Sequence, residues 1–406
     1  MKITYLHQYF NTPDMAGGTR SYEMARRLAA RGHEVKMVTS WRENKGRYRW
    51  FETREAGIRV YWLPVTYSNT MGYGERLQAF LKFAVSAASK AASFPADVVF
   101  ATSTPLTIAL PGAYTAWWRR VPMVFEVRDL WPELPIAVGA LRHPMLRMAA
   151  RGLEKFAYRQ SERIVVLSPG IKEGVVKAGI PEEKTAVIPN SSDIDFFDPN
   201  YSDSKSFRSE HPEIGNAPLI LYAGSMGRIN GIDSLPRIAA VCRDKGSRLQ
   251  FAVIGKKGQE EDKVWAIAKQ LGVLSKNFHI YQSVPKRNMP DILAAADVAV
   301  SLFVDLKAMW ANSANKFFDA LASGTPVAIN YGGWQAELLE KAGAGIVLPP
   351  NNSEEAARRL DDFLNDEVKL AEASKAARKL AEKQFNRDKL ADYLEQVLLS
   401  AVKPKC

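Results

Sequence analysis

The sequence predicts an α/β protein built from two doubly wound domains. Short apolar runs alternate with helical patterns over most of the 406 residues, which is typical of parallel sheets covered by helices on both faces. The alternation breaks over residues 188–218, where Pro, Asn, Ser and Asp are frequent and no period persists. Because the chain is also longer than one core usually supports, we expect one domain on each side of this break.

The first half contains seven apolar runs of strand length, several of them apolar on both faces as buried parallel strands are. The expected strands are 3–6, 35–39, 60–63, 98–101, 123–127, 164–167 and 186–188. The expected helices are 20–31, 77–93, 144–159 and 170–178. Gly32 and Gly179 follow the first and last of these helices, where helix ends are expected.

The second half restarts the same alternation. The expected strands are 219–223, 249–254, 278–281, 298–302, 327–330 and 345–348. The expected helices are 231–244, 260–271, 289–295, 315–322 and 335–342, followed by a nearly all-helical tail over 353–402. Doubly wound sheets bind ligands at the carboxyl ends of their strands, so the loops at those ends are the first places to search for a site.

Composition narrows the class of protein. The formal net charge is +11, and residues 1–200 hold 27 Lys/Arg against 19 Asp/Glu, which suggests an anionic partner for the first half. Its most apolar stretch, 77–94, is interrupted by Lys82 and Lys90 and is too polar to span a membrane. The first ten residues have the pattern of a strand and not of a signal peptide, so we expect a cytoplasmic protein. Two cysteines and five scattered histidines lack metal-ligand spacing, so no metal is expected.

Two segments of the first half carry candidate site residues. Gly17 and Gly18 precede a predicted helix, where glycine lets the backbone approach a ligand and the helix N-terminus favours an anion. Arg128 and Asp129 follow a predicted strand directly. An ordinary turn and a set of solvated surface charges are the plain alternatives for these two segments.

Two segments of the second half look like phosphate-binding loops. Gly224 and Ser225 follow the first strand there, and Arg228 in the same loop can donate two hydrogen bonds to a phosphate. Residues 312–315 form a small polar loop that enters a helix, with Lys316 available for a phosphate and Asp319 one turn further on for sugar hydroxyls. A capped helix packed on a sheet would give a similar pattern.

With these residues in hand, the chain resembles family 4 of the retaining nucleotide-sugar glycosyltransferases, and within it the bacterial O-antigen and capsule enzymes of the L-fucosamine transferase kind. The resemblance covers essentially the whole chain, and the order and spacing of its markers are more specific than any one of them. The markers are LHQYF, GGTRSYEMARRLAARGHEV, FEVRDLWPE, VIPNSSDIDFF, YAGSMGRINGID and SANKFFDALASGTPVAI.

The resemblance implies a GT-B fold, with two Rossmann-like domains facing a central cleft. It implies an acceptor-binding domain over 1–190, a linker over 191–217, a nucleotide-sugar-binding domain over 218–385, and a last helix over 386–406 that packs back on the first domain. The implied donor is a UDP-sugar carrying an N-acetylated hexosamine or deoxyhexosamine, and no metal is obligatory.

The resemblance also implies roles for residues. Asp319 matches the residue that binds the ribose, and Val284 stands where the base is held. The implied diphosphate contacts are Gly17, Gly18, Gly224, Ser225, Asn312, Ser313, Ala314 and Asn315. Arg128 and Asp129 stand near a histidine that many members use beside the sugar, and we include them as catalytic candidates.

Three positions depart from the family pattern. Ala311 replaces a second glutamate, and the usual Arg and Lys of the phosphate clamp fall on Ser225 and Asn230. We therefore expect Arg228 and Lys316 to neutralise the leaving diphosphate.

Other functions fit the same pattern. A non-hydrolysing nucleotide-sugar 2-epimerase has a similar two-domain fold but needs no acceptor, and a non-catalytic nucleotide-binding module would bind without turnover. The basic and aromatic stretch 41–59, beside the apolar stretch 77–94, suggests peripheral contact with an anionic inner-membrane surface and a lipid-linked glycan acceptor. A core helix beside a solvated basic loop is the alternative there. No nucleic-acid partner is expected.

Overall fold

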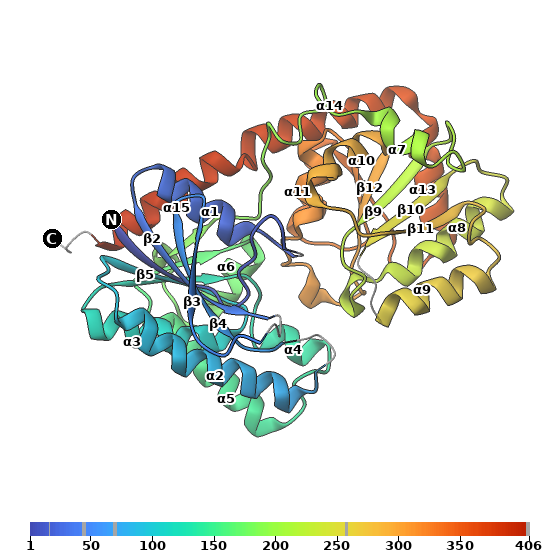
Figure 1. Cartoon of the computed structure of the whole chain (residues 1–406). Helices are drawn as coiled ribbons and strands as arrows, with labels where there is room; N and C mark the ends of the chain where they lie inside the picture. The colour runs from blue at the N-terminus through green and yellow to red at the C-terminus, as the bar shows by residue number, and fades with distance from the viewer. Residues whose placement is uncertain (16, 43–45, 68–70, 256–258, 403–406) are drawn as a thin grey trace. The chain divides into compact units, whose positions relative to one another are not determined.

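A computed structural model of the chain describes residues 1–15, 17–42, 46–67, 71–255 and 259–402. The chain folds into two compact units, one made of Met1–Pro189 with Asp388–Cys406 and one made of Asn190–Arg387. Each unit is a parallel sheet with helices packed on it (Figure 1). The predicted fold class, two doubly wound Rossmann-like domains, is therefore confirmed.

The first unit contains an eight-stranded sheet in the order β3-β4-β2-β1-β5-β6-β7-β8. Its neighbouring strands pair in parallel, except that β3 and β4 are antiparallel. The strands are β1 (Lys2–Leu6), β2 (Glu34–Trp41), β3 (Phe51–Glu55), β4 (Ile58–Pro64), β5 (Val98–Thr102), β6 (Met123–Val127), β7 (Arg163–Val166) and β8 (Thr185–Val187). The helices are α1 (Arg20–Ala30), α2 (Tyr73–Ala92), α3 (Ala109–Arg119), α4 (Glu133–Ala137), α5 (Pro144–Arg159), α6 (Pro169–Lys177) and α15 (Arg387–Val402).

Two layers of helices cover this sheet. Figure 1 shows α1 and α15 on one side of it and α2, α3 and α5 on the other. Leu394 and Leu398 of α15 are buried in one cluster with Met24 and Leu28 of α1. The C-terminal helix thus completes the core of the unit in which the chain begins.

The sequence reading missed β3 and α3. β3 turns back on β4 through Ala56 and Gly57, which both have positive φ, as the tight turn of a β-hairpin requires. α3 contains Pro111 and Gly112, which normally argue against a helix. Pro111 lies in the first turn of α3, where a missing backbone N–H is harmless. Gly112 allows close packing on the sheet, because a Cβ at this position would lie only 2.9 Å from the sulfur of Met123.

The second unit contains a six-stranded parallel sheet in the order β11-β10-β9-β12-β13-β14. The strands are β9 (Leu219–Ala223), β10 (Gln250–Gly255), β11 (Phe278–Gln282), β12 (Val298–Ser301), β13 (Val327–Ile329) and β14 (Gly345–Val347). The helices are α7 (Ser204–Glu210), α8 (Leu235–Asp244), α9 (Gln259–Gln270), α10 (Met289–Ala295), α11 (Asn315–Ala322), α12 (Trp334–Ala342), α13 (Ser353–Asn365) and α14 (Glu367–Gln384). Because β9 and β12 are central and adjacent, the loops that follow them meet at one edge of the sheet.

The segment 191–217, expected to be a linker, contains α7 and belongs to the second unit. α7 packs against α10, and Arg208 forms an ion pair with Asp297 at 3.0 Å. This segment therefore has a fixed place in the second unit.

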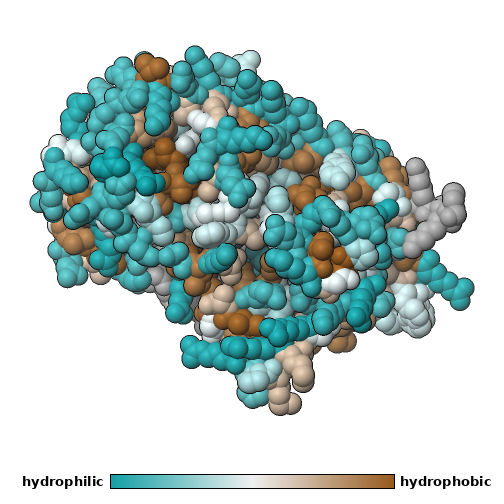
Figure 2. Space-filling view, turned by 180° about the vertical axis from the view of Figure 1, so that it is seen from behind, coloured by the Kyte–Doolittle hydropathy of each residue, from teal (hydrophilic) through white to brown (hydrophobic). Residues whose placement is uncertain are grey.

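The surface seen in Figure 2 is mainly hydrophilic, and its hydrophobic residues form small separate groups. Among the described residues, no helix combines the length and the apolar character needed to cross a membrane.

Candidate functional site

The clearest candidate site lies at the carboxyl edge of the second sheet and centres on Lys316. This residue is in the first turn of α11, and its Nζ lies 2.9 Å from the hydroxyl of Tyr222 on β9 and 3.4 Å from Asn230 Oδ1. The ammonium also lies 4.3 Å from the centre of the Tyr222 ring, which provides a cation–π contact. Gly224 borders the same site, since a Cβ there would lie 3.5 Å from Lys316 Cε.

The electrostatics of Lys316 favour an anionic ligand. Within the described residues no carboxylate lies at ion-pair distance from its Nζ, and its hydrogen-bonding partners are neutral side chains. Burial lowers the pKa of Lys316 to about 7. A buried ammonium without a negative partner has an unfavourable desolvation free energy, which a bound anion offsets. Lys316 is therefore suited to bind a phosphate.

The N-terminus of α11 adds a second anion-binding feature. Ala314 is its N-cap and supplies no side-chain hydrogen bond, so among the residues that the structure describes no side chain is seen to cap the first turn. The preceding loop is fixed from outside the helix. The backbone N–H of Asn190 donates to Ser313 Oγ at 3.1 Å, and Trp334 Nε1 donates to the carbonyl oxygen of Asn312 at 2.9 Å. Asn315 begins the helix, so residues 312–315 form an entry to it that these two hydrogen bonds hold in place.

Asp319 lies one turn further along α11. Ser192 Oγ donates to its Oδ1 at 2.6 Å, and Lys286 Nζ lies 3.8 Å from its Oδ2. Lys286 is two residues after Val284, which is half-buried in the loop between β11 and α10. The loop that contains Val284 therefore reaches Asp319 through Lys286. The sequence did not predict Ser192 or Lys286 as site residues, because neither lies in the glycine-rich or polar loops from which the site was predicted.

The loop after β9 holds the remaining candidates of this unit. Ser225 is exposed, while its carbonyl oxygen accepts hydrogen bonds from Tyr222 and Asn230 at 2.7 and 2.9 Å. Arg228 is exposed at the start of the short 3-10 helix Arg228–Asn230. The structure therefore brings Gly224, Ser225 and Lys316 together through Tyr222 and Asn230, whereas Arg228 stands on their solvent side.

Asn230 occupies the position to which the sequence resemblance assigns a clamp lysine, and its Oδ1 lies 3.4 Å from Lys316 Nζ. The positive charge near this position comes from α11 and not from the loop itself. The sequence of the loop alone does not show that a cation from α11 lies beside Asn230.

The first unit has its own cluster at the carboxyl ends of β1, β5 and β6. Arg128 Nη1 lies 3.4 Å from His7 Nε2, and the Arg128 backbone N–H donates to Ser103 Oγ at 3.0 Å. Asp129 Oδ2 accepts a hydrogen bond from Thr104 at 3.1 Å, and burial raises the pKa of this carboxyl. Arg128 and Asp129 are therefore ordered by neighbouring strand ends.

His7 was not among the predicted site residues. It is buried directly after β1, and in the described part of the chain its Nδ1 has no hydrogen-bond partner. Burial, together with the positive charges of Arg128 and Arg42, holds the pKa of His7 well below its usual range. A neutral imidazole beside Arg128 is the kind of group that could contact a sugar hydroxyl.

The glycine loop lies beside the same strand end. Gly17 has φ +136°, and a Cβ there would lie 2.5 Å from Asn11 Nδ2. Asn11 donates from that nitrogen to the carbonyl oxygen of Gly18 at 3.2 Å and accepts a hydrogen bond from Arg42. Glycine at position 17 thus allows the loop to fold closely over Asn11.

A buried ion pair supports this loop from beneath. Arg20, the first residue of α1, contacts Glu126 Oε1 on β6 at 2.9 Å and donates to the carbonyl oxygens of Ile188 and Pro189. Burial raises the pKa of Glu126, but the charges of Arg20 and Arg128 and a hydrogen bond from Thr102 outweigh it, and the net pKa is lowered. Glu126 therefore has a structural role, although it lies only two residues before Arg128.

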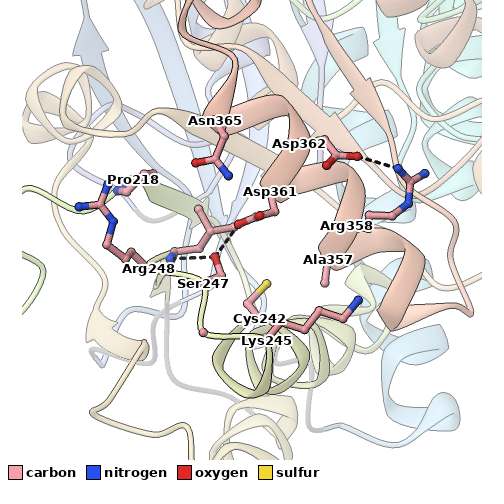
Figure 3. Close-up of a pocket in the computed structure, with 12 residues that line it drawn as sticks. Pro218, Cys242, Lys245, Ser247, Arg248, Ala357, Arg358, Asp361, Asp362 and Asn365 are labelled. Atoms are coloured by element: carbon pink, nitrogen blue, oxygen red, sulfur yellow. Dashed lines mark hydrogen bonds and ion pairs between the residues drawn. The ribbon is translucent and has the colours of Figure 1, made fainter.

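A cavity of about 300 Å³ elsewhere in the second unit does not belong to this site (Figure 3). Pro218 and Leu249, which line it, precede β9 and β10, so it lies at the amino ends of the strands. Asp361, which lines this cavity, accepts a hydrogen bond from Ser247 at 2.6 Å. Cys242 lines the same cavity, and burial raises the pKa of its thiol to about 12. The thiol is therefore unreactive at neutral pH.

Comparison with known families agrees with this geometry. Residues 16–191 match the family described as "Glycosyl transferase 4-like domain", and residues 203–380 match "Glycosyl transferases group 1". The two matches are consecutive, and each lies almost entirely within one unit of the structure.

Similar proteins point the same way. The colanic acid biosynthesis glycosyl transferase WcaI of Escherichia coli is 23% identical over 302 residues, which are 70% of this chain and 73% of WcaI. Sucrose-phosphate synthase of Thermosynechococcus elongatus has a TM-score of 0.78 at 16% identity, with 98% of each chain covered. HepE of Anabaena, solved with UDP and glucose, has a TM-score of 0.72 at 18% identity, with 98% of this chain and 100% of HepE covered.

Proposed function

Since this chain is a glycosyltransferase of the GT-B type, we propose that it is a retaining enzyme that uses a UDP-sugar. The sugar is an N-acetylated hexosamine or deoxyhexosamine, as in the L-fucosamine transferase group that the sequence resembles. The acceptor is a lipid-linked glycan in O-antigen or capsule synthesis. The similarity to WcaI, a protein named for colanic acid biosynthesis, supports a biosynthetic role.

The observation that carries the donor assignment is the uncompensated cation at Lys316. Its buried ammonium and the uncapped N-terminus of α11 together favour a diphosphate. Asp319 lies one turn away, within reach of the ribose of a nucleotide whose diphosphate rests on Lys316. The HepE structure contains UDP, which supports uridine as the base at Val284.

In the proposed reaction, the acceptor hydroxyl attacks the anomeric carbon from the face that the diphosphate leaves. The new C–O bond forms as the bond to the β-phosphate oxygen breaks, and the hydroxyl proton passes to that oxygen. Lys316, Arg228 and the α11 N-terminus stabilise the negative charge that grows on the leaving group, without an obligatory metal. Arg128 and Asp129 orient the sugar.

The acceptor assignment includes a membrane. We propose that the first unit rests on the anionic inner face of the cytoplasmic membrane and takes its acceptor from there. The excess of basic residues in residues 1–200 supports this, since a basic protein surface is attracted to anionic lipid.

The test begins with a thermal-shift panel of UDP, GDP and ADP, because a ligand at 100 times its Kd stabilises a protein by about 2.7 kcal/mol. UDP release is then measured with UDP-sugars, with and without lipid-linked acceptors, and NMR of the product gives its anomeric configuration. Transfer with retention supports the proposal. Inversion would contradict the mechanism, conversion of the donor without acceptor would indicate an epimerase, and binding without turnover would indicate a binding module. Activity that survives EDTA would support the metal-free mechanism.

A further inference from the structure

An exposed apolar and aromatic face covers α2, α3 and α5 of the first unit. Of the 20 large hydrophobic side chains that are exposed among the described residues, 11 lie on these three helices. The helices are neighbours on one side of the sheet, with α2 packed on α3 and α3 on α5 (Figure 1). We call this surface the α2/α3/α5 face.

The aromatic centre of the face is on α3. Trp117 and Trp118 are 71% and 57% exposed, and the Tyr114 ring stacks near Trp118 with 6.2 Å between centroids. Val85 on α2 and Met148 on α5 are equally open, at 74% and 70%. Two adjacent tryptophans left in water are unfavourable for a protein that meets only water, so this face is expected to be covered by a partner.

The charge of the face identifies the partner. The three helices contain eight Lys/Arg and two Asp/Glu, and one of the acidic residues, Glu154, is buried. Lys82 and Arg151 are exposed on α2 and α5. A second copy of the chain would place two basic faces against each other, which is unfavourable. Tryptophan and tyrosine prefer the interface of a bilayer, and basic side chains beside them attract anionic headgroups.

We infer that the α2/α3/α5 face is the surface that docks on an anionic lipid bilayer, with Tyr114, Trp117 and Trp118 inserted among the headgroups. The inference rests on the membrane association proposed above. It keeps the apolar stretch 77–94 that the sequence suggested, since this stretch overlaps α2, but it replaces the stretch 41–59 with α3 and α5. In the stretch 41–59, Trp41 and Phe51 pack against Trp62, and Lys45 lies outside the described residues. Trp41 and Phe51 are therefore partly buried against the core of the first unit, and Tyr48 is the exposed aromatic residue of this stretch.

The test is flotation of the full chain with vesicles of phosphatidylcholine, with and without phosphatidylglycerol. The variant Trp117→Ser/Trp118→Ser should lower the partition coefficient by about tenfold or more, because it removes the inserting rings. The variant Lys82→Glu/Arg151→Glu should lower it by at least about tenfold and abolish its dependence on anionic lipid. Binding of the unmodified chain should weaken as salt is raised.

Matched controls change the same residue types elsewhere. Tyr201→Ser/Trp265→Ser removes exposed aromatic rings of the second unit, and Lys375→Glu/Lys379→Glu reverses two exposed charges on α14. Both should float like the unmodified chain, and circular dichroism should show that every variant is folded. Quenching of tryptophan fluorescence by brominated lipid should be lost in the Trp117→Ser/Trp118→Ser variant, fall together with binding in the Lys82→Glu/Arg151→Glu variant, and persist in both controls.

Each other outcome has a definite meaning. Flotation of all variants equal to that of the unmodified chain would overturn the docking face but leave the proposed membrane association standing. Failure of the unmodified chain to float would overturn both, without touching the UDP-sugar assignment, which is measured in solution. The unmodified chain could instead form a dimer that does not float with vesicles and that the Trp117→Ser/Trp118→Ser substitutions dissociate. In that case the face is a contact between two copies of the chain, and the inference is wrong.

Discussion

The ammonium of Lys316 on α11 lies 2.9 Å from the hydroxyl of Tyr222 on β9, and the ring of that tyrosine lies beneath it. Tyr222 OH in turn donates to the carbonyl oxygen of Ser225, so one hydroxyl joins the cation to the loop after β9. The cation is held in place before any ligand binds, and its positive charge has no negative partner among the described side chains. Such a preorganised charge stabilises a leaving diphosphate without rearrangement.

The affinity for UDP should therefore depend on pH above neutrality. The pKa of Lys316 is about 7 in the free protein, and a bound diphosphate raises it. Below pH 7 the ammonium is already charged, so UDP binds at full strength. Above pH 7 binding must take up a proton, and the affinity should fall by up to about tenfold per pH unit. Calorimetry in buffers of different ionisation enthalpy measures both the affinity and the proton uptake.

Lys316→Met is the matched control for this pH dependence. It should bind UDP more weakly at pH 6 and show little change in affinity between pH 7 and 9. An unmodified protein whose UDP affinity stays constant over that range would show that Lys316 does not contact the diphosphate.

Asp319 should recognise the ribose of the donor. Asp319→Asn should weaken UDP binding by about 1.5–3 kcal/mol, the range for a lost hydrogen bond to a charged group. The unmodified protein should also prefer UDP over its 2′,3′-dideoxy analogue, and Asp319→Asn should lose that preference. Asp362→Asn, an exposed carboxylate on α13, should change neither quantity. Equal discrimination in the Asp319→Asn variant would place the ribose elsewhere.

Arg228 should act on turnover. It is exposed in the ligand-free loop, so Arg228→Ala should leave the fold intact and lower kcat/KM by about 10²–10³ if it stabilises the departing diphosphate. Arg248→Ala, in the cavity at the amino ends of the strands, is the control and should retain full activity. A fully active Arg228→Ala enzyme would leave Lys316 as the cation responsible.

The parts of the molecule that local patterns predict are the strands and the loops that follow them. The apolar run 219–223 forms β9, and the run 298–302 contains β12, because burial on both faces leaves little other choice of residues. Parallel strands carry their following loops to one edge of the sheet, so the sequence alone places Gly224 and the segment 312–316 at one site.

The remaining contacts of the candidate site join residues that are far apart in the sequence. Ser192 meets Asp319 across 127 residues of sequence, and Asn230 meets Lys316 across 86, so no window of the sequence contains either pair. The exposed face at Trp117 and Trp118 was missed for a related reason. Tryptophan next to apolar residues usually indicates a core, and only the packing of α3 shows which of its sides remains open.

Arg128 and Asp129 should affect the transfer step and not the nucleotide. They belong to the first unit, whereas the proposed UDP contacts at Lys316 and Asp319 belong to the second. Arg128→Ala and Asp129→Asn should therefore lower kcat by about tenfold or more while the Kd for UDP stays unchanged. Parallel loss of UDP affinity would show that these residues bind the diphosphate instead. His7→Asn should lower kcat as well, because His7 Nε2 contacts Arg128.

The Arg20–Glu126 pair should control the stability of the first unit. Both side chains are almost fully buried, so Glu126→Gln leaves the charge of Arg20 without its partner and should destabilise this unit by about 3–5 kcal/mol. Arg20→Met/Glu126→Met removes both charges and should recover part of that loss, though not all, because the carbonyl oxygens of Ile188 and Pro189 then lack their donor.

Urea unfolding, followed by tryptophan fluorescence, measures these differences, and UDP binding reports whether the second unit stays folded. Since the pKa of Glu126 is lowered in the folded protein, its stabilising effect should be present at neutral pH and lost as the pH falls below the usual carboxyl range. The Glu126→Gln variant should lack that acid-dependent step. If it unfolds at the same urea concentration as the unmodified chain, the ion pair contributes nothing to stability and the α1 entry is held by other contacts.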